Sequence, residues 1–195
     1  MGLKQLRWVI VVGILIFGGT AKADSVYFNG SYAFGSGGYG IPPYGGTLDG
    51  QSASFYCVDF THDITGGTGW DADVTSLTGS DFSLTRLGNQ NLYLDMVWLV
   101  TRMVGTSDQN LQAQYQYAIW SITGGPDPFG TDATWVATAS AAVQTGFDGT
   151  GFLILTPTGS YGQEFLVQTP EPSTIILLGI AFAGVVALTR RVRTA

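Results

Sequence analysis

The chain has 195 residues and is acidic, with 14 aspartate and glutamate residues against 8 lysine and arginine residues and a net charge of −6. Between Asp24 and Thr169 only Arg86 and Arg102 are basic and thirteen residues are acidic, so this stretch carries a net charge of −11. Nucleic acid and anionic lipid are therefore disfavoured as partners, because the chain has too few cations to neutralise phosphates. A low content of charged residues together with 28 glycines is typical of extracellular, β-rich proteins.

Residues 1–23 predict a secretory signal peptide. Lys4 and Arg7 precede an apolar stretch over 8–19, and Ala21-Lys22-Ala23 has the small-x-small pattern of a signal peptidase site. We expect the mature chain to begin at Asp24, after cleavage by signal peptidase. An ordinary two-span membrane protein is the alternative, and the shortness of this first apolar stretch disfavours it.

The first third of the exported body reads as strands and loops. Residues 25–28 predict a strand, and the glycine-rich stretch 35–50 with its two prolines predicts a long loop. The run 54–60 has the highest β-propensity in the body. Alternating polar and apolar residues over 70–76 predict a half-buried strand that pairs with this run as a hairpin.

The middle of the body changes to helical periodicity. We predict one helix from about Leu92 to Met103, a second capped by Ser107 or Asp108, and a third capped by Asp132. Strand character returns over 152–155 and 164–167. The fold class is therefore α+β: residues 24–169 form a β-rich single domain with an inserted group of about three helices, and its first and last strands share a sheet.

Residues 170–195 form a separate C-terminal segment. Pro170-Glu171-Pro172 is followed by an apolar run over 175–189 and then by Arg190, Arg191 and Arg193. As a helix the run would span about 22 Å, against about 30 Å for the hydrocarbon core of a bilayer, so we expect a transient single-helix anchor. The arginines should stay on the cytoplasmic side and leave the body outside.

This order of Pro-Glu-Pro, helix and basic cluster resembles the PEP-CTERM sorting signal of Gram-negative bacteria that make exopolysaccharide. The resemblance implies recognition by a membrane-embedded exosortase that cuts near Pro170-Glu171-Pro172. It also implies export through the inner membrane, followed by release or transfer to the cell surface or the extracellular matrix.

Cys57 is the only cysteine, so no disulfide can form within the chain. Three roles remain: a buried inert thiol, a disulfide between molecules, or a reactive group. The runs Phe55-Tyr56-Cys57-Val58-Asp59 and Gln116-Tyr117-Ala118-Ile119-Trp120 resemble the two signatures of bacterial surface thioester domains. That resemblance implies an internal thioester between Cys57 and Gln116 that external amines open. By helical projection Gln116 and Trp120 share a face that could meet the cysteine strand.

The body contains no lysine, so no side-chain amine of its own could open such a bond. His62 is the only histidine, which excludes a histidine-based metal cluster and makes a Cys57–His62 hydrolase dyad improbable. We read Asp63, Asp71 and Asp73 as solvated loop acids. We predict no cofactor, no metal and no enzymatic turnover.

Two functions stay open: a covalent surface adhesin that captures an amine-bearing ligand, and a non-covalent structural protein of an exopolysaccharide or biofilm matrix. Under either function we expect the aromatic and aliphatic residues beside the two motifs to be buried in the core. The predicted core residues are Phe55, Val58, Phe60, Val97, Leu99, Val100, Leu111, Ile119, Trp120 and Leu153.

Overall fold

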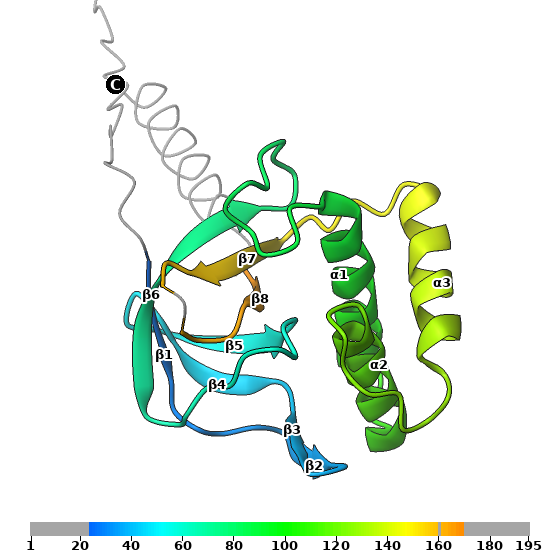
Figure 1. The fold of residues 1–195 in the computed structure, drawn as a ribbon, viewed down its shortest axis with the longest axis horizontal. Helices are drawn as coiled ribbons and strands as arrows, with labels where there is room; N and C mark the ends of the chain where they lie inside the picture. The colour runs from blue at the N-terminus through cyan, green and yellow to red at the C-terminus, as the bar shows by residue number, and fades with distance from the viewer. Residues whose placement is uncertain (1–23, 160, 170–195) are drawn as a thin grey trace, which may run out of the picture.

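The computed structural model describes residues 24–159 and 161–169. They form a closed six-stranded barrel with a layer of helices against one side (Figure 1). The predicted signal peptide over 1–23 and the predicted C-terminal segment over 170–195 lie outside the described residues. Within the described ranges, no helix combines the length and apolar character that a membrane crossing requires.

The barrel strands follow the order β1-β4-β5-β8-β7-β6, and all neighbours are antiparallel. The first and last strands share this barrel, as predicted. Its strands are β1 (Asp24–Phe28), β4 (Tyr44–Leu48), β5 (Gln51–Cys57), β6 (Thr68–Ser76), β7 (Phe152–Pro157) and β8 (Phe165–Gln168); a separate hairpin joins β2 (Phe34–Ser36) and β3 (Tyr39–Ile41).

The loop predicted over 35–50 was wrong, because β2, β3 and β4 occupy it. Glycine serves close packing here: a Cβ on Gly46 would lie 2.0 Å from the carbonyl oxygen of Tyr27 on the neighbouring strand. Such a position accepts no side chain, although the same residue read alone suggests a loop.

The predicted hairpin between the cysteine strand and residues 70–76 was also wrong. Strand β5 pairs with β4 and β8, whereas β6 pairs with β1 and β7. The turn at Asp49 and Gly50 decides the partner of β5: both residues have positive φ, 50° and 76°, as tight two-residue hairpins require. On its other edge β5 pairs with β8, where Cys57 lies opposite Phe165.

The three predicted helices are present as α1 (Gln90–Val104), α2 (Gln109–Ser121) and α3 (Asp132–Gln144). Asp108 caps α2 by accepting hydrogen bonds from the backbone of Asn110 and Leu111. The cap predicted for α3 was wrong: Thr131 is the N-cap, and Asp127 accepts hydrogen bonds from the first backbone N–H groups. Asp132 is free to turn its carboxyl inward, and its residue is 2% exposed.

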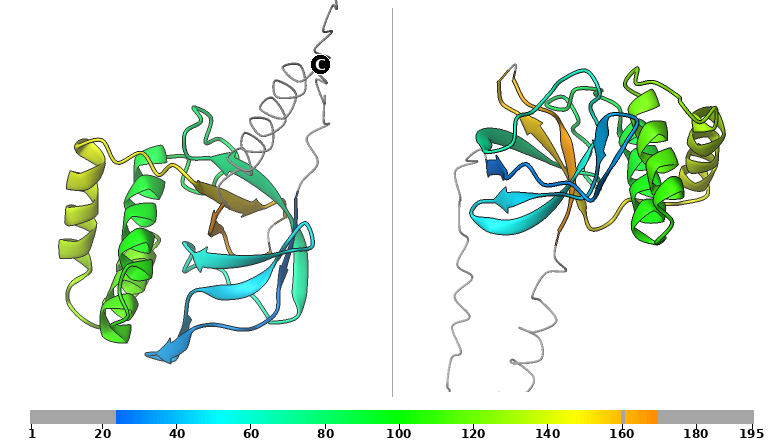
Figure 2. Two further views of the ribbon diagram at one scale, coloured as in Figure 1. Left: turned by 180° about the vertical axis from the view of Figure 1, so that it is seen from behind. Right: turned by 90° about the horizontal axis from the view of Figure 1, so that it is seen from below.

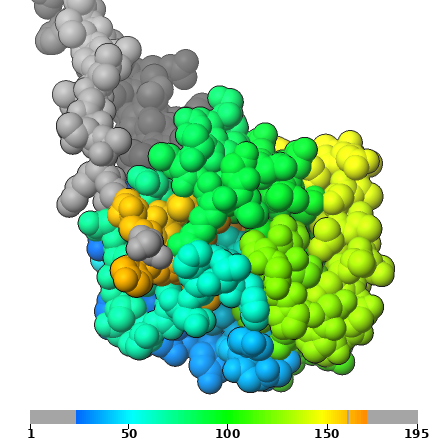
Figure 3. All heavy atoms as spheres, viewed as in Figure 1, coloured from blue at the N-terminus to red at the C-terminus, as the bar shows by residue number. Residues whose placement is uncertain are grey.

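Helices α1 and α2 lie next to the barrel, and α3 packs on their outer side (Figures 1 and 2). The space-filling view shows the helical layer, green to yellow, directly against the strands (Figure 3). Helix α2 contributes to both hydrophobic cores. Ala113, Tyr117 and Trp120 belong to the cluster that includes Phe55, Cys57 and Phe165, and Tyr115, Ala118 and Ile119 belong to the cluster that includes the buried residues of α1.

Most of the predicted core residues are buried. Seven are at most 3% exposed, and the other three are partly buried at the edges of the two cores. The first group is Phe55, Val58, Val97, Leu99, Val100, Ile119 and Trp120; the second is Phe60, Leu111 and Leu153.

Candidate functional site

Cys57 and Gln116, which are 59 positions apart in the chain, meet where the barrel contacts α2. Both residues are 0% exposed. The Gln116 side-chain Nε2 donates a hydrogen bond of 2.8 Å to the carbonyl oxygen of Cys57. The structure therefore brings together the two residues that the sequence motifs singled out.

Trp120 lies one helical turn after Gln116 and shares its face of α2. Its indole Nε1 donates to the Cys57 Sγ at 3.3 Å. The Cys57 thiol in turn donates to the carbonyl oxygen of Asp59 at 3.3 Å. The sulfur is thus held between a helix donor and a loop acceptor.

Burial raises the pKa of the Cys57 thiol to about 12, although hydrogen bonding to the sulfur from the Trp120 indole and from the Asp59 backbone acts in the opposite direction. At neutral pH the sulfur is consequently a protonated thiol. Because the thiolate is the nucleophilic form, external reagents would react with it slowly even if they could reach it.

The Gln116 amide has one feature that packing does not explain. Its Oε1 is buried and has no hydrogen-bond partner among the described residues. A buried carbonyl without a partner costs about 1–3 kcal/mol. The same absence of donors means that a tetrahedral adduct at this carbon, whether formed by water, by Cys57 or by an amine, would receive no hydrogen bond to its oxyanion from the described residues.

A charged network that sequence reasoning missed follows directly after Cys57. Asp59 is 2% exposed and forms an ion pair with Arg86, and its Oδ2 lies 2.8 Å from the Nδ1 of His62. His62 therefore contacts this carboxylate, and not the sulfur, in the described structure. The rarity of arginine in the body was the signal that could have identified Arg86.

The same arginine ties the cysteine loop to β8. Its backbone N–H donates to the Glu164 Oε1 at 3.1 Å, and its Nη2 donates to the carbonyl oxygen of Gly162 at 2.7 Å. Glu164 is 1% exposed and also accepts hydrogen bonds from Tyr93 and Thr156. This network holds the segment that follows Cys57 against the segment that precedes β8.

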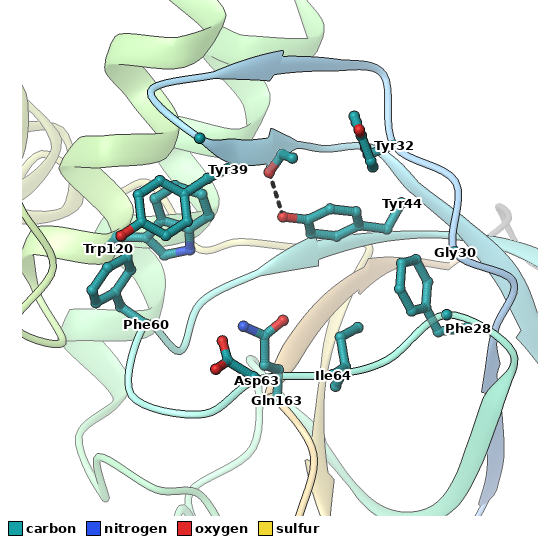
Figure 4. A pocket seen from close by; sticks show the side chains of 13 residues that line it. Phe28, Gly30, Tyr32, Tyr39, Tyr44, Phe60, Asp63, Ile64, Trp120 and Gln163 are labelled. Atoms are coloured by element: carbon teal, nitrogen blue, oxygen red, sulfur yellow. Dashed lines mark hydrogen bonds between the residues drawn. The ribbon is translucent and has the colours of Figure 1, made fainter.

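A pocket of about 520 Å³, drawn in Figure 4, is lined by Trp120, the residue whose Nε1 contacts the Cys57 sulfur. Trp120, Tyr39 and Phe60 form the end next to α2, and the ring centroids of Tyr39 and Phe60 both lie 5.6 Å from that of Trp120. Tyr44 lines the middle and donates from its hydroxyl to the Gly40 carbonyl oxygen at 2.6 Å. The Trp120 ring therefore separates the pocket from the Cys57 sulfur.

Residues 168–191 match the family described as the PEP-CTERM protein-sorting motif. The match includes Pro170, Glu171 and Pro172 together with Arg190 and Arg191, whereas Arg193 follows it. The chain thus carries a PEP-CTERM protein-sorting motif, which implies export and sorting by an exosortase.

Neither a curated protein nor a solved structure matches the chain. The resemblance of the body to thioester domains gains no support from these comparisons and rests on its own residues. The sorting residues 170–172 and the basic residues 190, 191 and 193 lie outside the described part of the structure.

Proposed function

We propose that this exosortase-sorted surface protein forms an internal thioester between Cys57 and Gln116 and uses it to attach covalently to an amine-bearing ligand. The observation that carries the proposal is the fully buried hydrogen bond from the Gln116 side-chain amide to the main-chain carbonyl oxygen of Cys57, which places the two residues side by side. The glutamine side chain thus reaches the only cysteine of the chain in an environment without solvent, and the reaction then requires the Cys57 sulfur to turn toward the Gln116 side-chain carbon.

The bond forms without an external oxidant or reductant. The Cys57 sulfur attacks the Gln116 side-chain carbon, the C–Nε2 bond breaks, and Nε2 leaves as ammonia with the thiol proton. The carbonyl oxygen Oε1 stays in place. An incoming primary amine then attacks the same carbon, the carbon–sulfur bond breaks, and the amine proton returns to Cys57. The products are an amide at Gln116 and a free thiol.

The surroundings of the two residues would protect the thioester from reaction until an amine-bearing ligand arrives. Both partners are excluded from solvent, so water has no direct access. Residues 24–169 contain no lysine, so the body has no side-chain amine that could consume the thioester. Each molecule reacts once, because the amide is not reversed, and the protein is therefore an adhesin and not a catalyst.

The intact mass of residues 24–169 tests the proposal. These residues contribute both hydrophobic cores and every barrel strand, so they make up one folding unit. We expect a mass one ammonia below the sequence mass, and we expect methylamine to add and to release a thiol. Cys57→Ala and Gln116→Ala should each abolish both effects.

Resistance of Cys57 to thiol reagents is not decisive, because a buried protonated thiol is also unreactive. The full sequence mass, unchanged by methylamine, would refute the thioester. It would favour the second function, a non-covalent structural protein of the surface or matrix with Cys57 as a core residue. Complete burial of Cys57 within the barrel core is the observation on which this second function rests.

A further inference from the structure

We propose that the aromatic pocket beside Trp120 binds a primary alkylammonium group and holds it next to the bond between Cys57 and Gln116. The chemical outcome of this binding rests on the proposed function, whereas the binding itself does not. Three observations carry the inference: the aromatic walls, the sign of the charge in the pocket, and the contact between the pocket wall and the sulfur.

The walls of the pocket present aromatic rings from separate parts of the chain. Tyr39 comes from the small hairpin, Phe60 from the loop after Cys57, and Trp120 from α2. Tyr39 packs edge-on against Phe60 and Trp120, with centroids 5.4 and 5.6 Å apart, and remains 43% exposed. Ring faces attract ammonium groups through their quadrupole, and most strongly where water is partly excluded.

The charge of the pocket selects a cation. Asp63 is the only charged residue that lines it, and its exposed carboxylate lies at the side of Phe60 (Figure 4). Neither arginine of the body lines this pocket: Arg86 is paired with Asp59, and Arg102 stacks over Trp98 at 4.6 Å. With a body charge of −11, long-range attraction also favours a cationic ligand.

Two lining residues connect the pocket to the sulfur. The Trp120 indole that faces the pocket donates to the Cys57 Sγ from its Nε1. Gln163 also lines the pocket, and its Nε2 donates at 3.3 Å to the Asp59 carbonyl oxygen that accepts the Cys57 thiol. To open the thioester, the bound ammonium group must give a proton to solvent and the Trp120 ring must move aside, after which the free amine can attack the Gln116 carbon.

The first test measures binding in Cys57→Ala, which cannot form the thioester. The probes are n-butylammonium and the neutral, similarly shaped n-butanol, and the readout is tryptophan fluorescence or chemical-shift change. We expect saturable binding of n-butylammonium only. Asp63→Asn should weaken it about two- to fivefold, and Tyr39→Ala should abolish it. Asp71→Asn removes an exposed acid outside the pocket and is the matched control. Equal binding of the two probes, or equal effects of Asp63→Asn and Asp71→Asn, would overturn the inference.

The second test measures thioester opening in the wild-type body as a function of n-butylammonium concentration at constant pH. A rate that saturates, and that saturates at higher concentration in Asp63→Asn, supports the pocket. A thioester that forms but opens at a rate linear in amine, unchanged by Asp63→Asn, contradicts the pocket and leaves the proposed function intact. A full sequence mass contradicts the proposed function, and the binding test with Cys57→Ala then still decides the pocket.

Discussion

Asp132→Asn should remove a pH-dependent loss of stability that is built into the start of α3. The Asp132 carboxyl is buried, and neither of its oxygens has a hydrogen-bond partner among the described residues. Burial, reinforced by repulsion from Asp127, raises the pKa of this carboxyl from 3.8 to about 7. In the unfolded chain the same group ionises near its ordinary value, whereas in the folded protein it keeps its proton until near neutrality.

The direction of the effect follows from linkage. Because the folded pKa is raised, folding carries no penalty from Asp132 below about pH 4, and the penalty grows as the pH rises toward 7. The gap between 3.8 and about 7 sets a ceiling of about 4 kcal/mol at roughly 1.36 kcal/mol per pH unit. Screening by nearby solvent reduces this to about 1–2 kcal/mol, or about 2–8 °C in the unfolding midpoint.

Thermal unfolding of residues 24–169, followed by circular dichroism between pH 4 and pH 8.5, measures this effect. At pH 4 the wild type and Asp132→Asn should unfold within about 1 °C of each other, since a protonated carboxyl resembles an amide. At pH 8 the variant should be the more stable of the two. Asp71→Asn, which changes an exposed acid, is the control. Parallel curves for Asp132→Asn and wild type across the whole pH range would refute the raised pKa.

Three further outcomes are expected. Trp120→Ala should lower the free energy of unfolding by about 3–5 kcal/mol in chemical denaturation, because this residue is 3% exposed. Tyr161→Ala is the control: this residue is 87% exposed, so the free energy of unfolding should change by less than about 0.5 kcal/mol. Equal effects of the two substitutions would contradict the packing role of Trp120. Tyr93→Phe should cost about 1–3 kcal/mol, because it removes a buried hydroxyl donor from Glu164, and an unchanged denaturation midpoint would show that this hydrogen bond is not stabilising. In a host with an exosortase, the mature protein should lose residues 175–195, and Pro170→Ala combined with Pro172→Ala should leave a longer, membrane-retained form. Recovery of wild-type surface protein that still contains peptides from 181–189 by mass spectrometry would show that processing does not occur.

The sorting motif and the positions of the helices could both be predicted from the amino-acid sequence. A sorting signal is read as a contiguous segment, so Pro170-Glu171-Pro172 with its apolar run and arginines could be recognised without a fold, and the match over 168–191 agrees. Helices depend on interactions a few residues apart. The cap at Asp108 and the apolar spacing of α1 and α2 were therefore visible in the linear chain.

The pairing of the strands and the burial of particular polar groups could not be predicted from the sequence, since both depend on residues far apart in the chain. Gly46 read as a loop residue because nothing local shows that Tyr27 will lie against it. The motifs nominated Cys57 and Gln116, but their contact exists because β5 and α2 pack together across 59 positions. Likewise, Asp132 looked like a helix cap, and the fold turned its carboxyl inward because Asp127 already serves the backbone N–H groups at the start of α3.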